Sequence, residues 1–271
     1  MISTTPDGQI GAMFQAPGEA NRLILYLTAG DPTLEATGDL LRAIDQGGAD
    51  LIELGVPFSD PMADGVVIQH ASERALRAGA TLGKIMALLP EWRKRVRAPI
   101  ILFTYYNPVL QYGLERFARD LARGGGQGAL VVDLSPEEAE PYVAAMRAEK
   151  LDTVFLASPT STDDRLARIA KLSSGFLYLI SRSGVTGERA TLSASVPPLV
   201  ERVRKFTNLP LAVGFGLSNP EQVRQAQTLA GAAVVGSALV RAIEESYARE
   251  GSGAIEGFVR WLKSGTGSRP Q

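Results

Sequence analysis

LIELGVPFSDPMADG, residues 51–65, is the stretch that decides the fold. It begins as an apolar strand, yet it carries a carboxylate, Glu53, inside the apolar run. Side chains that neighbour each other along a strand point to opposite faces, so Ile52 and Leu54 share one face and Glu53 lies on the other. If the apolar pair faces a layer of helices, Glu53 points inward, into a sheet that closes on itself.

Eight short runs rich in Val, Ile, Leu and Tyr alternate with amphipathic segments, which is typical of a parallel sheet covered by helices. Eight such units in about 250 residues match a (β/α)8 barrel, also called a TIM barrel. A doubly wound sheet is the alternative, but it usually has fewer strands and a GxGxxG turn after the first, where this chain has TAGDP (28–32). The predicted strands are 22–28, 50–55, 99–105, 128–134, 152–158, 175–181, 209–215 and 231–236.

The helices between these strands follow from apolar periodicity and from start signals. Ser135-Pro136 and Ser218-Asn219-Pro220, each followed by acidic residues, are typical N-caps. The long interval between the second and third strands leaves room for an additional helix over 81–96, and an extra N-terminal segment precedes the first strand. No linker or repeat divides residues 1–271, so we expect a single domain. The other predicted helices are 34–46, 114–122, 136–149, 163–172 and 220–229.

Composition excludes several classes of function. A net charge of −1 gives no reason to expect nucleic acid or an anionic membrane as a partner. The sequence has no cysteine and one histidine, His70, which argues against disulfides, thiolate metal sites and a Ser-His-Asp triad. The first residues lack the features of a signal peptide, and the longest apolar stretch, residues 229–240, is too short to span a bilayer. We therefore expect a soluble, cytoplasmic protein.

Glu53 and Asp64 are the candidate chemical groups of the quoted stretch. Barrel enzymes carry their chemistry at the C-terminal ends of the strands, where Glu53 is expected. Apolar surroundings raise the pKa of a carboxyl group toward the range useful for acid–base catalysis. The alternatives are that Glu53 is paired with an arginine or caps a turn, and that Asp64-Gly65 is simply a turn or a helix N-cap.

The last two strands end in glycine-containing turns, VGFGLSNPEQV (213–223) and VVGSALV (234–240). Barrels often bind phosphate with the loops after strands seven and eight, through backbone N–H groups. Gly216 and Gly236 permit close backbone approach, and Ser237 offers a hydroxyl group. The loop SRSGVTG (181–187) is either a lid over the site or a plain surface loop.

Six motifs together resemble the tryptophan synthase alpha subunit family, in the family's order from about residue 22 to 240. That family is a (β/α)8 barrel that cleaves indole-3-glycerol phosphate to indole and glyceraldehyde 3-phosphate, in the last steps of tryptophan biosynthesis. The resemblance therefore implies a carbon–carbon lyase. The motifs are YLTAGDP (26–32), LIELGVPFSDPMADG (51–65), TYYNPVLQYG (104–113), YLISRSGVTG (178–187), VGFGLSNPEQV and VVGSALV.

The resemblance assigns catalytic and binding roles to the residues of this chain that match the family's motifs. The resemblance implies that Glu53 is the general acid/base, that Asp64 contacts the indole nitrogen and that Tyr178 lies near the reacting glycerol moiety. The same comparison assigns substrate-binding positions in the indole pocket, the lid and the phosphate region. The indole-pocket positions are Tyr26 and Tyr105, and the lid positions are Thr186 and Gly187. The positions of the phosphate and adjacent indole-binding region are Gly187, Phe215, Gly216, Gly236 and Ser237.

The resemblance also implies a partner. Pro57 and Asp60 match loop residues that meet a beta subunit in an alpha2beta2 assembly, where indole passes between two active sites. Pyridoxal phosphate is expected in that beta subunit, while this chain is expected to need neither a cofactor nor a metal. The chain departs from the family at Val66 and Ser135, where proline is common.

The residues supply a chemical route for this cleavage. No lysine is expected at a strand end to form a Schiff base. Protonation of the indole ring at C3 makes the ring an electron sink, so an acid (Glu53) and a charge-stabilising carboxylate (Asp64) suffice, with Tyr178 assisting. The alternatives are a stand-alone lyase that releases free indole, and a scaffolding barrel that binds a phosphorylated ligand and activates a partner. Other phosphate-binding barrels share the glycine loops but lack the ELGVPFSDP stretch.

Overall fold

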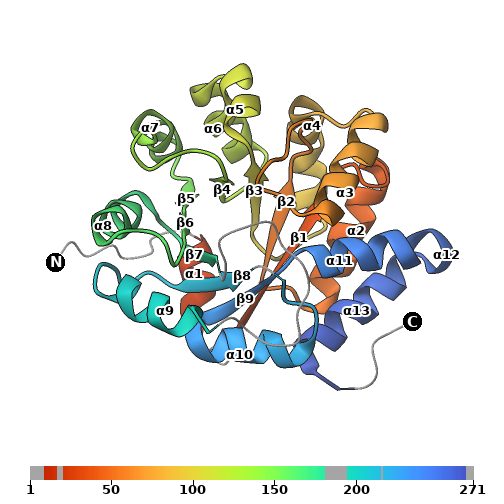
Figure 1. Ribbon diagram of the computed structural model, residues 1–271. Coiled ribbons are helices and arrows are strands. Elements are labelled where there is room, and N and C mark those ends of the chain that lie inside the picture. Colours follow the sequence, from red (N-terminus) through yellow and green to blue (C-terminus); the bar gives the residue numbers. More distant parts are fainter. Residues whose placement is uncertain (1–8, 17–20, 181–193, 215, 267–271) are drawn as a thin grey trace.

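Nine parallel strands form one continuous sheet in the computed structural model, which describes residues 9–16, 21–180, 194–214 and 216–266 (Figure 1). Their order across the sheet is β5-β4-β3-β2-β1-β9-β8-β7-β6. The strands are β1 (Arg22–Thr28), β2 (Leu51–Gly55), β3 (Ile100–Thr104), β4 (Gly128–Val131), β5 (Asp152–Val154), β6 (Leu156–Ala157), β7 (Leu177–Ile180), β8 (Leu211–Gly214) and β9 (Gly231–Val235).

The two ends of this sheet meet. β5 and β6 lie at opposite ends of the strand order, yet only Phe155 separates them along the chain. The carbonyl oxygen of Phe155 accepts a hydrogen bond from the Tyr178 amide of β7 at 3.1 Å. β5 and β6 are therefore two halves of a fifth strand, and the sheet is an eight-stranded barrel. This confirms the predicted (β/α)8 fold and rules out the doubly wound alternative.

Helices surround the barrel on its outer side (Figure 1). The predicted additional helix after the second strand is α4, whose N-cap Thr81 accepts a hydrogen bond from the Lys84 amide. The helices are α1 (Gln9–Gln15), α2 (Leu34–Gly47), α3 (Val66–Arg77), α4 (Leu82–Arg93), α5 (Tyr106–Tyr112), α6 (Leu114–Arg123), α7 (Glu140–Ala148), α8 (Asp163–Leu172), α9 (Val196–Arg204), α10 (Pro220–Ala230), α11 (Ser237–Ala242), α12 (Ala248–Glu250) and α13 (Ser252–Ser264), with a π-helical segment, Ile243–Tyr247, before α12.

One predicted helix start is wrong and another is confirmed. The helix expected from residue 136 begins at Glu140, and Ser135 instead closes a separate turn in which its carbonyl accepts from the Glu138 amide. Pro141 explains the late start, because proline lacks an amide hydrogen and is tolerated only in the first turn of a helix. Asn219 caps α10 as predicted, with its side chain accepting from the Gln222 amide.

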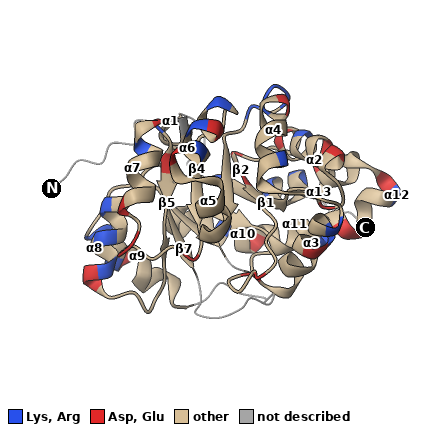
Figure 2. Cartoon of the chain, turned by 90° about the horizontal axis from the view of Figure 1, so that it is seen from above, with Lys and Arg blue, Asp and Glu red and all other residues tan. Residues whose placement is uncertain are grey.

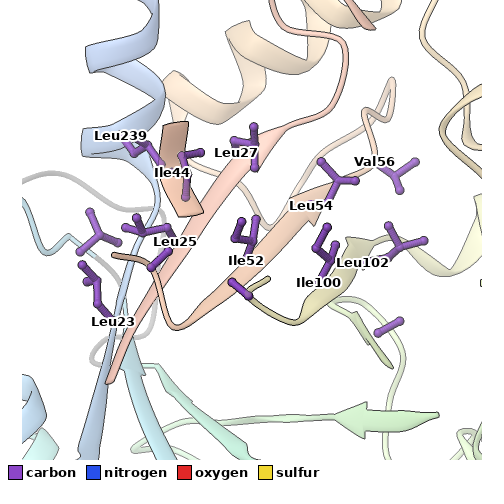
Figure 3. Packing of buried hydrophobic residues seen from close by; sticks show 14 of the residues in the cluster. Leu23, Leu25, Leu27, Ile44, Ile52, Leu54, Val56, Ile100, Leu102 and Leu239 are labelled. Carbon is purple, nitrogen blue, oxygen red and sulfur yellow. The ribbon is translucent and has the colours of Figure 1, made fainter. Parts of the chain in front are cut away.

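The strands bury both of their faces, as their continuous apolar runs predict. Figure 3 shows outward side chains of β1, β2 and β3, which pack in one cluster with Ile44 of α2 and Leu239 of α11. Each fully buried side chain of this size contributes about 1.5–3 kcal/mol to folding. Ile52 and Leu54 belong to this outer cluster, whereas Leu51 belongs to a second cluster inside the barrel. Glu53 therefore lies on the inward face, as the alternation along β2 predicts.

The extra N-terminal segment covers the N-terminal end of the barrel. Ile10 of α1 is fully buried in the inner cluster, and the ring of Phe14 lies 5.9 Å from that of Phe176. Phe176 directly precedes β7, so α1 packs where the strands begin. An apolar cluster therefore lies between this end of the barrel and the level of Glu53.

Charged residues lie mainly on the surrounding helices and loops, as Figure 2 shows. Of the helices that the structure describes, none has the length and apolar character needed to cross a membrane. Glu53 is an exception to this outer distribution, because it lies on a central strand with 1% of its surface exposed.

Candidate active site

Glu53 projects into the barrel from the middle of β2. It is in register with Tyr26 of β1 and Ile101 of β3, so these three residues stand at one level of the barrel wall. Its Oε1 atom has no hydrogen-bond partner among the described residues. Burial raises the pKa of the Glu53 carboxyl to about 8, because the charged form loses its hydration. No arginine pairs with Glu53 in the described part of the chain, which goes against the ion-pair alternative.

Asp64 is the second buried carboxylate, and it is held by a tyrosine. The Tyr105 hydroxyl donates a hydrogen bond to Asp64 Oδ2 at 2.9 Å and accepts one from the Ala63 amide at 3.1 Å. Burial raises the pKa of Asp64 to about 6, and the hydrogen bond from Tyr105 opposes this shift. The N-cap of α3 is Gly65, without a side-chain cap, so the N-cap alternative for Asp64 is wrong.

One cavity at the C-terminal end of the strands brings most of the predicted site together. Glu53, Asp64 and Tyr178 all line it, which places the three candidate catalytic residues around a common space. Thr186, Gly187 and Phe215 lie outside the described residues. The remaining lining residues are Tyr26, Ala63, Gly65, Ile68, Phe103, Gly216, Val234, Gly236 and Ser237.

Four apolar residues that line the cavity were not predicted from the sequence: Ala63, Ile68, Phe103 and Val234. Phe103 packs edge-on against Tyr26, with ring centroids 5.1 Å apart and an interplanar angle of 77°. The sequence held a signal for Phe103, because it lies two residues after Ile101 and alternation along β3 places both on the inward face. Ile68 of α3 packs on Tyr26 in a small cluster above the barrel. Ile68 reaches the cavity because α3 packs over the barrel, and no sequence signal predicts this contact.

Glycines at two strand ends make room for the tyrosine rings. A Cβ atom on Gly55, the last residue of β2, would lie 2.2 Å from the Tyr26 hydroxyl oxygen. A Cβ atom on Gly214, the last residue of β8, would lie 2.1 Å from the Tyr178 hydroxyl oxygen. Burial raises the pKa of both phenols, and neighbouring carboxylates add to the shift. Both tyrosines therefore stay protonated at neutral pH.

The glycine loops after β8 and β9 also line the cavity. Gly216 has a φ of +84°, a left-handed conformation that favours glycine. Gly236 precedes α11, which begins at Ser237, and both residues line the cavity with Gly216. Backbone N–H groups at the start of a helix and a serine hydroxyl suit an anionic group. The predicted phosphate region is thus brought next to Glu53 and Tyr178.

The loop between β2 and α3 joins this cavity to the surface. Pro57 is buried, whereas Asp60 is exposed and accepts a hydrogen bond from the Ser59 hydroxyl at 2.7 Å. The Phe58 ring packs against the Tyr105 ring at 5.0 Å. The exposed part of the loop is therefore connected through Tyr105 to Asp64.

Comparison with known proteins identifies the family. The family model described as "Tryptophan synthase alpha chain" matches residues 14–261 of this sequence. The chain belongs to the tryptophan synthase alpha chain family. The resemblance predicted from the six motifs is thereby confirmed.

Individual members of the tryptophan synthase alpha chain family are similar over nearly their whole length. The alpha chain of Solibacter usitatus is 55% identical over 266 residues, which cover 96% of this chain and 99% of the relative. Among solved structures, tryptophan synthase of Mycobacterium tuberculosis matches with a TM-score of 0.85 at 37% identity, covering 94% of this chain and 96% of that one. The a2b2 complex of Pyrococcus furiosus matches with a TM-score of 0.83 at 40% identity, covering 90% and 98%.

One departure from the tryptophan synthase alpha chain pattern lies next to the site. Val66 stands where the family commonly has proline, and it is the first residue of α3, with 58% of its surface exposed. Gly65 before it keeps an extended backbone (φ −74°, ψ 161°), so the helix begins directly after Asp64 and Gly65 without proline.

We expect Gly55→Ala to lower the free energy of unfolding by about 1–3 kcal/mol, because the new methyl group overlaps the Tyr26 ring. Urea denaturation measures this change. The matched control is Gly83→Ala on α4, where a Cβ atom meets nothing within 4 Å and alanine is the better helix former. A second substitution, Tyr26→Leu, should recover part of the loss in Gly55→Ala. Equal stability of the Gly55→Ala and Gly83→Ala variants would contradict the assigned fit.

Proposed function

We propose that this chain cleaves indole-3-glycerol phosphate to indole and glyceraldehyde 3-phosphate, a carbon–carbon lyase reaction of tryptophan biosynthesis. The observation that carries the proposal is a buried carboxyl, Glu53, with one oxygen unpaired among the described residues, in a cavity that Asp64 also lines. Membership of the tryptophan synthase alpha chain family supports the same reaction. A barrel that only bound a ligand would have no use for an inward acid with a raised pKa.

The first step of the proposed reaction is a proton transfer from Glu53 to C3 of the indole ring. With a pKa of about 8, this carboxyl is largely protonated at neutral pH and can donate. Protonation at C3 places positive charge at the ring nitrogen. Asp64, with a pKa of about 6, is largely ionised at the same pH and stabilises that charge. Burial thus gives the two carboxyl groups different protonation states and different roles.

The second step breaks the bond between indole C3 and the adjacent glycerol carbon. The glycerol hydroxyl on that carbon loses its proton, a carbonyl forms, and the bonding electrons enter the ring, which becomes neutral indole. We assign the hydroxyl proton to the Glu53 carboxylate, which returns to its protonated state. Tyr178 stays protonated and assists by donating a hydrogen bond near the reacting hydroxyl. Positioned acid–base catalysis contributes about 10²–10⁴-fold, and substrate positioning supplies the rest.

The cavity offers surroundings for both the indole ring and the phosphate of the substrate. Tyr26 and Phe103 form an aromatic wall at the side of Asp64, suited to the indole ring. Gly216, Gly236 and Ser237 suit the phosphate. The family pattern adds Tyr105 and Phe215 to the indole and phosphate surroundings, and Thr186 and Gly187 to a lid over the substrate.

We further propose that the chain works without a cofactor or metal of its own, because the protonated indole ring accepts the electrons in this route. The beta partner is expected to carry pyridoxal phosphate. We also infer that residues 1–271 act as one barrel domain, since α13 near the C-terminus packs against α2 near the N-terminus. A cytoplasmic location fits a biosynthetic enzyme without cysteine.

The proposed partner is a beta subunit in an alpha2beta2 assembly. The related Pyrococcus furiosus structure is described as an a2b2 complex with mutual activation. In this chain the exposed Asp60, together with Pro57, lies in the loop that reaches Asp64 through Phe58 and Tyr105. A beta subunit bound to this loop would act directly on the placement of Asp64.

Release of indole from indole-3-glycerol phosphate, measured with and without a purified beta subunit, tests the function. We expect slow release by the chain alone and stimulation by at least about tenfold in the complex. Full activity without a partner would support the stand-alone lyase instead. No release under either condition would overturn the proposed reaction and favour the scaffold.

A further inference from the structure

Helix α3 is fastened to the TAGDP turn (Thr28–Pro32) that follows β1. Gly30 in this turn has a φ of +90°, and a Cβ atom there would lie 2.4 Å from the Cβ of Ala80 and 3.4 Å from that of Ala75. The C-terminal end of α3 and the residues just after it therefore rest directly on the turn. This contact leaves no room for a side chain at position 30.

A bidentate ion pair reinforces the contact. Arg74 of α3 donates from Nε to Asp31 Oδ1 and from Nη2 to Asp31 Oδ2, both at 2.9 Å. The Asp31 side chain is only 6% exposed, so one partner of this pair is buried. Arg74 also donates from Nη1 to Glu244 Oε1 at 2.8 Å, but Glu244 is half exposed. Paired hydrogen bonds to a buried carboxylate fix both distance and direction, whereas an exposed pair contributes little.

The opposite end of α3 belongs to the site. Asp64 and Gly65 immediately precede the helix, and Ile68 in its first turn lines the cavity. Ala71, one turn further along, is fully buried and clusters with Tyr26 and Val240. A shift of α3 on the TAGDP turn would therefore move the carboxylate and one wall of the cavity together.

We propose that Arg74 is a positioning residue. By holding α3 on the TAGDP turn, it keeps Asp64 hydrogen-bonded to the Tyr105 hydroxyl and Ile68 packed against Tyr26. This inference rests on the proposed function for its kinetic consequence. Arg74 does not line the cavity, so it acts through α3 and not on the substrate. Because Asp64 acts on charge that develops during the reaction, loss of Arg74 should lower kcat more than it raises KM.

The test compares Arg74→Gln with a matched control, Arg202→Gln. Arg202 of α9 also donates from Nε and Nη2 to an aspartate, Asp163 Oδ1, at 3.2 and 2.8 Å. The two arginine side chains are similarly exposed, 29% and 32%. Arg202 does not line the cavity. Both variants should lose some thermal stability, so the comparison separates positioning from general stabilisation.

We expect Arg74→Gln to lower kcat for indole release by about tenfold or more and to weaken indole binding about fivefold, with inorganic phosphate binding within about twofold of the wild type. Arg202→Gln and Glu244→Gln should each leave kcat within about twofold. Arg74→Lys should restore kcat only in part, because lysine keeps the charge but not the planar fork.

Four results would overturn the proposal: near-wild-type kcat in folded Arg74→Gln, unchanged indole binding in that variant, an equal loss in Arg202→Gln, or full restoration by Arg74→Lys. The binding measurement keeps this proposal separate from the proposed function. If the wild type released no indole, the proposed function would be rejected. Unchanged indole binding in Arg74→Gln would reject the positioning role independently of that result.

Discussion

Replacing Glu53 by glutamine is expected to lower turnover by about 10³-fold while leaving substrate binding within a fewfold of the wild type. Glutamine keeps the size and the inward direction of the side chain but has no proton of suitable acidity for indole C3. Single-turnover measurement of indole release, together with direct titration of substrate binding, separates the two effects. Near-normal turnover in Glu53→Gln would reject Glu53 as the proton donor.

The wild-type pH profile gives an independent check on the same residue. Glu53 donates in its protonated form, so turnover should fall as pH rises through about 8, where burial places the pKa of this carboxyl. Stability should respond in the same window. Between the ordinary pKa of 4.5 and about 8 the folded chain holds a proton that the unfolded chain has lost, so stability falls as pH rises.

Glu53→Gln removes this dependence and should be more stable than the wild type at pH 8, by on the order of 3 kcal/mol, but not at pH 4. Denaturant midpoints at the two pH values measure the difference. An inactive variant that is also more stable under alkaline conditions would mark Glu53 as a group kept for chemistry at the expense of stability.

Asp64→Asn is expected to reduce kcat by about 10²–10³-fold, because a neutral amide stabilises the positive charge at the indole nitrogen far less than a carboxylate. The substitution preserves the size of the side chain, so KM should change much less than kcat. Steady-state kinetics across pH provide the measurement. In the wild type the activity should fall as pH drops through about 6, where Asp64 becomes protonated, and the asparagine variant should lack this acidic limb.

Tyr105→Phe is the matched test of the same assignment. The hydrogen bond from the Tyr105 hydroxyl lowers the pKa of Asp64, so its removal should raise that pKa and move the acidic limb to higher pH. The limb should remain in Tyr105→Phe and vanish in Asp64→Asn. An unchanged acidic limb in Asp64→Asn would mean that another group controls it.

Local sequence pattern was sufficient to place the central acid. Alternation along β2 puts Glu53 on the face opposite Ile52 and Leu54, because a strand has a period of two whatever it packs against. The apolar character of the strands indicated that both faces are covered, and the structure confirms this. The turn signals around Asn219 also gave the correct helix start, because capping depends only on residues nearby in the chain.

Features that depend on contacts distant in sequence could not be predicted in this way. The Tyr105–Asp64 hydrogen bond joins residues on separate strands and loops, and the Gly55 contact depends on the orientation of the Tyr26 ring. Taken alone, Asp64 was open to interpretation as a helix cap, whereas in the structure Gly65 holds that position. The interruption of the fifth strand at Phe155 likewise follows from closure of the barrel.

The short helix α1 affects the end of the barrel through which substrate enters and product leaves. Ile10 and Phe14 pack where the strands begin and close the N-terminal end of the barrel. The substrate and the products are therefore expected to pass through the C-terminal end of the barrel, where the cavity lies. The loops at this end therefore govern whether an apolar product is released into water or reaches a neighbouring protein. A subunit bound to these loops would control which of the two occurs.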